Sequence, residues 1–284
     1  MITHLVRIIL IILVIALCIV YPFLPGEYDS LAMPLSTIAQ GFGALGVLLV
    51  PVGALWLIAE LRQRSRPIKA RGFVFAVITV IIGTLIATAL MLAGVGTVGP
   101  SLAIFLLAGW LYSLSKIIPL LRAMRYSERD RFNPTPLYLV TIPLAALIIQ
   151  LAAAVPLTAA SRARAIASSA EMIANIEAYR AAQGRYPHSL LGVWKDYYPH
   201  VVGVERYYYR PERDAYNLYF EQPRFLLDNV GTREFVVYNP LDEHFMVSHP
   251  SFMLRLTPAQ FESSPGWYEV HDLGTDHWRY FWFD

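Results

Sequence analysis

Long apolar segments separated by short polar loops dominate residues 1–157. Each has about 20 residues, which is the length that a helix needs to cross a hydrocarbon core of about 30 Å. None carries Asp, Glu, Lys or Arg near its centre. The segments are Leu5–Leu24, Thr37–Ala59, Gly72–Gly94, Ser101–Leu121 and Leu137–Leu157. The pattern predicts a membrane α-helical bundle of five transmembrane helices in residues 1–157, followed by a second domain in residues 158–284.

Small and amide side chains interrupt the apolar segments at a few positions. Small residues let two helix backbones approach closely. The second segment has Ala39, Gly43 and Gly46, and the third has Gly83 and Ala87. Gln40 and Gln150 are suited to hydrogen bonds between helices. Transporters and proton relays usually place ionisable residues within the membrane, so the apolar segment centres disfavour those functions.

Charge is distributed unevenly along the chain. Residues 1–157 carry 11 Lys and Arg against 5 Asp and Glu, whereas residues 158–284 carry 12 against 16. Most of the positive loop charge lies in 60–71 and 122–133, although Arg162 and Arg164 follow the fifth segment. Positive loops stay in the cytoplasm, so five crossings place the N-terminus in the cytoplasm and the second domain outside a bacterial inner membrane. Interspersed carboxylates in the second domain disfavour a nucleic-acid partner.

The first segment is expected to remain as an anchor. No small-x-small cleavage site follows it, and Leu17 before Cys18 does not suit a lipoprotein signal. Cys18 is the single cysteine of the chain, so the second domain must be stable without an internal disulfide.

From Ala160 onward the helical pattern continues but becomes amphipathic. Ile166, Ala170, Ile173 and Ile176 recur at three- and four-residue steps and predict one apolar stripe. The helix is expected to end at Gly184, because glycine suits the left-handed cap conformation.

This region resembles the type IV pilins and type II secretion pseudopilins. The resemblance rests on Val155-Pro156, on the helix carrying Ile176-Glu177-Ala178-Tyr179-Arg180, and on Gly184-Arg185-Tyr186-Pro187-His188-Ser189-Leu190. In that family a helix that is half in the membrane packs its exposed end on an antiparallel sheet. The resemblance therefore implies a pilin-like α+β fold for residues 158–284.

Beyond Leu190 the pattern alternates between apolar and polar residues, with turn residues between short strands. It predicts three hairpins, namely 207–210 with 216–220, 234–238 with 245–248, and 267–270 with 278–283. Three hairpins and one long helix indicate a largely antiparallel α+β domain. The many aromatic residues fall at strand positions, which favours core packing over a ligand platform.

Histidine and carboxylate residues gather at two predicted turns. One group is Asp242-Glu243-His244 with His249, and the other comprises His271, Asp272, Asp276 and His277 around Gly274. A tight hairpin would bring the second set together, where it could bind zinc or another divalent cation. Turn carboxylates also commonly cap backbone amides, so the structural interpretation stays open. In pseudopilins a C-terminal loop can hold calcium, which keeps the Asp242-Glu243 turn as a resemblance-based alternative.

Motifs for other chemistries are missing from the sequence. It contains neither Gly-x-Ser-x-Gly nor a glycine-rich phosphate loop, and no cysteine occurs beyond residue 157. The favoured interpretation is a non-enzymatic, membrane-anchored domain that requires no cofactor and binds another envelope protein or a second copy of itself. The alternatives are a metal-binding enzyme or sensor that uses the second His/Asp set, and a small-molecule sensor that signals through the helix before Gly184.

Overall fold

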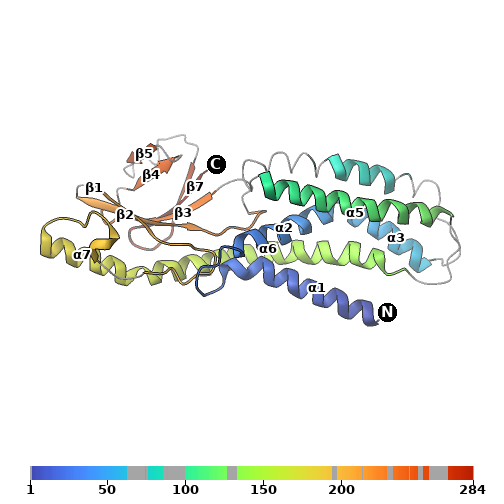
Figure 1. Cartoon of the computed structure of the whole chain (residues 1–284), viewed down its shortest axis with the longest axis horizontal. Helices are drawn as coiled ribbons and strands as arrows, with labels where there is room; N and C mark the ends of the chain where they lie inside the picture. The colour runs from blue at the N-terminus through green and yellow to red at the C-terminus, as the bar shows by residue number, and fades with distance from the viewer. Residues whose placement is uncertain are drawn as a thin grey trace. The chain divides into compact units, whose positions relative to one another are not determined.

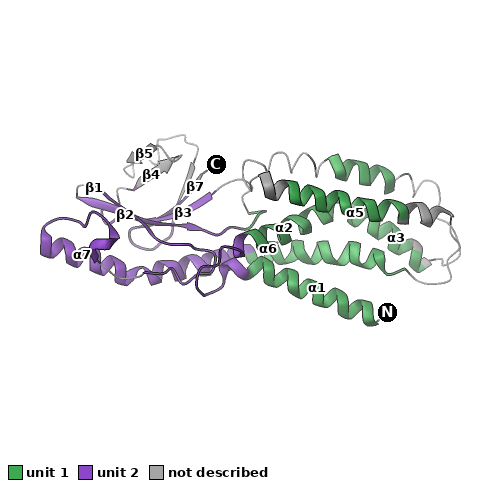
Figure 2. Cartoon of the chain, viewed as in Figure 1, with its two compact units in different colours: residues 1–20, 34–153, 225–231 green, residues 21–33, 154–224, 232–284 purple. Residues whose placement is uncertain are grey.

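The computed structural model describes residues 2–62, 74, 76–85, 88, 100–126, 133–193, 197–212, 214–228, 233–242, 244–248, 252–255 and 268–283. Helices occupy the N-terminal part and strands the C-terminal part (Figure 1). The chain divides into two compact units, each made of discontinuous segments (Figure 2). The helical unit contains residues 1–20, 34–153 and 225–231, and the sheet unit contains residues 21–33, 154–224 and 232–284.

Long apolar helices build the helical unit. They are α1 (Ile2–Val20), α2 (Ala32–Val47), α3 (Val50–Arg62), α5 (Pro100–Tyr126), the first part of α6 (Thr135–Ser168) and a helical stretch at Ala76–Leu85. Within the described residues, Ile2–Phe23 and Thr135–Gln183 are each long and apolar enough to cross a membrane, and α2 with α3 forms a third candidate span. The predicted segment Gly72–Gly94 lies partly outside the described residues. The predicted segment Ser101–Leu121 falls within α5, whose described apolar stretch Ile104–Pro119 is shorter than a full span.

The predicted helix Thr37–Ala59 is broken rather than straight. The axes of α2 and α3 differ by 54° across the break between Val47 and Val50. Pro51 explains the break, because proline has no N–H and its ring clashes with the carbonyl four residues earlier. Proline is tolerated in the first turn of a helix, which is its place in α3.

Two of these helices expose large apolar side chains. On α6, Ile148, Leu151 and Val155 are 63%, 65% and 74% exposed, and on α1 Leu13 and Leu17 are each 59% exposed. A contiguous apolar surface of this kind is rare on proteins that reside in water. The long apolar helices therefore indicate a membrane protein.

Glycines bring the α2–α3 pair close to α6. A Cβ atom added to Gly43 would lie 2.6 Å from the Ala146 Cβ, and one added to Gly46 would lie 2.8 Å from the Pro143 Cγ. The predicted role of these two glycines in helix packing is confirmed. A Cβ atom added to Gly83 would lie 3.3 Å from the Leu48 Cβ, and Ala87 lies outside the described residues.

A five-stranded antiparallel sheet forms the core of the sheet unit, in the order β1-β2-β3-β7-β6. Its strands are β1 (Tyr208–Glu212), β2 (Ala215–Gln222), β3 (Arg233–Tyr238), β6 (Tyr268–Asp272) and β7 (Trp278–Phe283). Strands β4 (Phe245–Ser248) and β5 (Phe252–Arg255) form a separate two-stranded sheet. The predicted combination of a helical membrane region with an antiparallel α+β region is confirmed at this level.

Two of the three predicted hairpins are confirmed, and one is wrong. Strands β1 and β2 pair as expected, as do β6 and β7, whose predicted first residue Trp267 lies outside the described residues. Strand β3 does not pair with β4, because β2 and β7 occupy its two edges. After β3, buried Asn239 bonds to Asn217 and Asp242 adopts a φ of 56°, so the chain turns away from the sheet.

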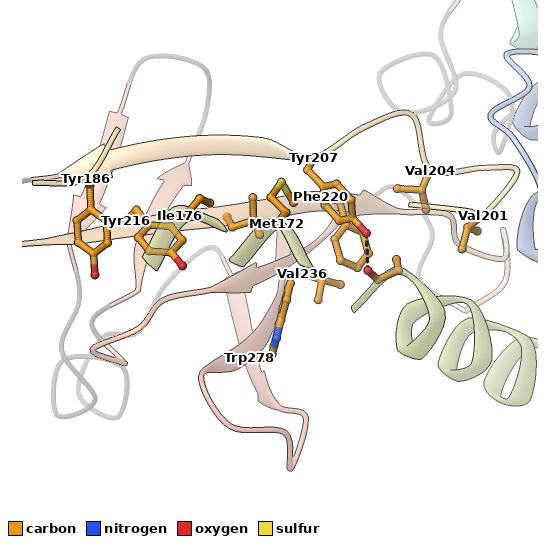
Figure 3. Packing of buried hydrophobic residues seen from close by; sticks show 12 residues of the cluster. Met172, Ile176, Tyr186, Val201, Val204, Tyr207, Tyr216, Phe220, Val236 and Trp278 are labelled. Carbon is orange, nitrogen blue, oxygen red and sulfur yellow. Dashed lines mark hydrogen bonds between the residues drawn. The ribbon is translucent and has the colours of Figure 1, made fainter. Parts of the chain in front are cut away.

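The C-terminal part of α6 and helix α7 (Ala170–Gln183) pack on the sheet. Helix α7 ends as predicted at Gly184, which has a φ of 70° and donates its N–H to the Arg180 carbonyl at 2.8 Å. The apolar core around Met172 and Ile176 also contains Tyr207, whose hydroxyl bonds to the Ala165 carbonyl (Figure 3).

The predicted stripe of this helix was partly wrong. Ala170 is exposed, and the fully buried positions are Ala165, Ser169, Met172 and Ile176. Ser169 can lie in an apolar stripe because its hydroxyl bonds back to the Ile166 carbonyl at 2.7 Å.

Candidate functional site

A buried carboxylate fastens α6 to the sheet. Glu234 on β3 is 1% exposed, and its Oε1 accepts a hydrogen bond of 2.9 Å from the Arg162 Nε on α6. Its Oε2 accepts the Trp282 indole N–H at 2.8 Å and lies 3.7 Å from the Arg224 Nε. A buried charge is tolerated only when it is paired and hydrogen-bonded, and Glu234 meets both conditions.

Aromatic rings complete the cluster around Glu234. The Arg162 guanidinium lies 4.1 Å from the centre of the Tyr280 ring, and the Arg224 guanidinium lies 4.3 Å from that of Trp282. His271 stacks on Tyr280 with ring centres 4.6 Å apart. Desolvated cation–ring contacts are attractive, so the cluster links the helix and strands β3 and β7 through several short contacts.

The predicted metal-site residues have different partners. His271 lies against Tyr280, whereas Asp272 accepts the Gly274 N–H at 2.8 Å. Adjacent strand residues face opposite sides of a sheet, which separates His271 from Asp272. His277 has its Nδ1 3.2 Å from the Asp242 Oδ2, and Asp276 is exposed in the turn.

Across the described ranges, which omit Glu243 and His249, no three His, Cys, Asp or Glu side chains gather as metal ligands would. Metal binding at His271, Asp272, Asp276 and His277 therefore stays a prediction.

His244 is a buried group whose environment the sequence did not reveal. It is fully buried beside the tilted Phe281 ring, and its two ring nitrogens lie 3.2 Å and 3.3 Å from the carbonyl oxygens of Asp242 and His277. Burial lowers the pKa of His244 to about 4, and the nearby Arg279 charge acts in the same direction. The side chain is therefore neutral near pH 7, where its single N–H can donate to only one of the two carbonyl oxygens.

The tyrosines on the helix-facing side fill the core. Tyr207 and Tyr216 are buried, and burial raises the pKa of each hydroxyl far above its ordinary value. Neither hydroxyl suits proton transfer near neutral pH. The expectation that aromatic residues pack the core is confirmed for these two residues and for Phe220 and Trp278.

A small pocket of about 210 Å³ opens on the sheet unit. Its walls come from the loop after α1, the start of α2, the segment before β1, strands β1 and β2, and the residue after β2. They comprise Tyr28, Asp29, Ser30, Met33, Gly203, Glu205, Arg206, Tyr208, Glu221, Gln222 and Pro223. No local pattern in the sequence indicates this pocket, because residues near position 30 and residues 203–223 meet only in the folded chain.

No known protein-family model matches the chain, and no curated protein or solved structure is significantly similar to it.

Proposed function

We propose that this chain is a non-enzymatic inner-membrane protein that presents a pilin-like domain to the periplasm. The domain would bind another component of the cell envelope, either a different protein or a second copy of the chain. One observation carries the proposal. Helices α6 and α7 together form a helical run, Thr135–Gln183, of 49 residues, which is much longer than a membrane requires.

The two parts of this helix have different surroundings. Its first part exposes Ile148 and Leu151, as a lipid-facing helix does, whereas Met172 and Ile176 are buried in the core of the sheet unit. The Arg162–Glu234 pair adds a buried polar link. A domain fastened in this way is held at a membrane by its own helix, which suits presentation to a partner.

The positive-inside rule and the five predicted crossings support the periplasmic side. Loops 60–71 and 122–133 supply most of the positive loop charge. Arg162 follows the fifth predicted crossing, so a simple count of positive charges near the membrane sets it against this orientation. Its charge is paired with that of Glu234. A long helix on an antiparallel sheet is also what the pilin resemblance implies for this region.

Orientation is tested by labelling single cysteines in intact cells with a membrane-impermeant maleimide. In a Cys18→Ser background, Ser189→Cys is exposed on the sheet unit, and Ser127→Cys lies in the predicted cytoplasmic loop. We expect labelling at 189 and protection at 127 until the cells are lysed. The reverse pattern would contradict the periplasmic assignment.

Partner binding is tested by photo-crosslinking in the native membrane. A photoreactive amino acid replaces Tyr198, which is 56% exposed on the sheet unit, and a matched control carries it at Leu151. We expect a reproducible protein adduct from position 198 and mainly lipid adducts from position 151. Failure to recover any protein or self-adduct from position 198 would overturn the proposal.

A further inference from the structure

The pocket on the sheet unit lies close to a predicted membrane surface. One wall of the pocket is the loop that holds Tyr28 and Asp29. This loop joins the candidate span that ends at Phe23 to helix α2, which begins at Ala32. Tyr28 follows Phe23 by five residues, and five extended residues reach at most about 18 Å. A ring tethered within this distance of the end of a candidate membrane span can reach the lipid headgroup layer.

Backbone hydrogen bonds hold this wall of the pocket in place. The Val202 N–H bonds to the Leu24 carbonyl at 3.0 Å, the Asp29 N–H to the Val202 carbonyl at 3.0 Å, and the Gly203 N–H to the Pro22 carbonyl at 2.8 Å. Asp29 is fixed further by the Tyr21 hydroxyl at 2.9 Å. The pocket is therefore preorganised, which lowers the entropic cost of binding a ligand.

Acidic and aromatic groups line the pocket, with one cation at its edge. The carboxylates of Asp29, Glu205 and Glu221 share the lining with the Tyr28 and Tyr208 rings, and Glu221 also pairs with the exposed Arg233 at 2.7 Å. Burial and the Glu205 charge raise the pKa of Tyr28, which is consistent with a negative potential. Arg206 is 64% exposed, and its Nε lies 3.6 Å from a Glu205 carboxylate oxygen.

We propose that this pocket binds the headgroup of an ethanolamine phospholipid. The ammonium lies among the carboxylates and against the tyrosine rings, and Arg206 contacts the phosphate. Charge-assisted hydrogen bonds and cation–ring attraction both favour this placement. A volume of about 210 Å³ is below the range of roughly 300–1,000 Å³ for drug-sized ligands, and it suits a headgroup.

The chemistry selects a primary ammonium over a quaternary one. A primary ammonium has three N–H donors for carboxylate oxygens, whereas a choline headgroup has none. One charge-assisted hydrogen bond corresponds to roughly tenfold or more in affinity. The inference depends on membrane insertion as proposed above, but it does not depend on the identity of the protein partner.

The test uses the full chain in nanodiscs that contain equal amounts of ethanolamine and choline phospholipids with the same acyl chains. Native mass spectrometry counts the lipid that stays bound after detergent exchange. Glu205→Gln removes one pocket charge, and Asp214→Asn makes the same change at an exposed turn position outside the pocket. Free phosphoethanolamine, offered to the lipid-depleted protein, distinguishes a soluble ligand from a lipid.

We expect the unaltered chain and Asp214→Asn to retain ethanolamine lipid about tenfold over choline lipid, and Glu205→Gln to lose most of this preference. Equal retention of the two lipids, or an unchanged preference in Glu205→Gln, would overturn the proposal. Tight binding of free phosphoethanolamine without lipid retention would also overturn it, because the source would then be a soluble amine. Since Glu205 is 51% exposed, its substitution should leave the fold intact, which hydrogen exchange of β1 and β2 verifies.

Discussion

The two units of the chain hold their helices in place by different means. In the helical unit, glycines at positions 43 and 46 allow close contact with α6, and the amides of Gln40 and Gln150 join neighbouring segments. In the sheet unit, the same helix α6 is held by a buried carboxylate with two guanidinium groups and large aromatic rings.

The difference follows from the solvent that each unit is expected to meet. Lipid tails are as apolar as leucine, so helices in a membrane gain little by burying apolar side chains and depend on close packing. In water the burial of aromatic surface drives packing, and it shields the few charges that enter the core. Glu60 is a buried carboxylate of the helical unit. It lies near the end of α3, where it accepts the Trp56 indole N–H at 3.1 Å.

The largest expected effect comes from breaking the charge cluster of the sheet unit. Glu234→Gln leaves Arg162 and Arg224 with a neutral partner in a buried site, and such a loss costs about 3–5 kcal/mol. We expect the strands to unfold at lower denaturant concentration, as measured by hydrogen exchange of peptides from β3 and β7.

Glu221→Gln is the matched control for that variant. Glu221 pairs with Arg233 at 2.7 Å, but both side chains are largely exposed, so its loss should cost at most about 1 kcal/mol. Equal effects of the two substitutions would show that the Glu234 cluster does not anchor the helix.

The next effect is a pH dependence confined to the sheet unit. His244 has a pKa of about 4 in the folded chain, against about 6.5 when unfolded, so between these values only the unfolded state binds the proton. Stability is complete above pH 6.5 and falls by about 3 kcal/mol as the pH drops to 4.

His244→Gln should remove most of the loss of stability between pH 6.5 and pH 4. The comparison is made after the pH dependence that both proteins share is subtracted. The measurement is the thermal midpoint of the sheet unit at pH 4 to 7 for both proteins. Parallel profiles would mean that His244 is not the buried neutral group described above.

The third prediction concerns helix packing in the helical unit. Gly43→Ala places a methyl group 2.6 Å from the Ala146 Cβ, and overpacking of this kind costs about 1–3 kcal/mol. Gly41→Ala is the control on the same helix, because its nearest neighbour is the methyl end of Leu106 at 3.1 Å, which can move. Unfolding in detergent, followed by circular dichroism, should show a larger loss for position 43 than for position 41.

Local rules explain which features the sequence could predict. The apolar runs, the glycine cap at Gly184 and the two tight hairpins depend on residues close together in the chain, and the structure contains them. The stripe on the helix before Gly184 was misplaced because Met172 and Ser169 were not counted as core residues. Periodicity alone does not distinguish two adjacent stripes when small residues occupy both.

Pairing between distant segments could not be predicted. Strand alternation specifies which side of a sheet a residue faces but not which strand lies beside it, so the partner of β3 was wrongly assigned. The cluster of Arg162, Arg224 and Glu234 has no local signal, because its members come from three separate elements. The His271 to His277 turn has residue types that can ligate a metal, and metal binding there stays a prediction. The contacts of His271 with Tyr280 and of His277 with Asp242 could not be predicted from the sequence.

The smallest expected effect tests the polar contacts of the helical unit. The Gln40 Nε2 donates to the Ser36 hydroxyl at 2.9 Å, and its Oε1 accepts the Leu226 backbone N–H at 2.7 Å. Gln40→Leu removes one bond within α2 and one to the segment after β2, and side-chain hydrogen bonds of membrane helices are worth about 0.6–2 kcal/mol. Because Leu226 belongs to the segment between β2 and β3, we expect faster hydrogen exchange at residues 225–228 with little change in overall stability.

Gln150→Leu is the control for this variant. It removes the 3.3 Å bond to the Gln40 carbonyl and should leave that exchange unchanged. Faster exchange in both variants would mean that loss of the helix contacts, rather than loss of the Gln40 side-chain bond, releases the segment.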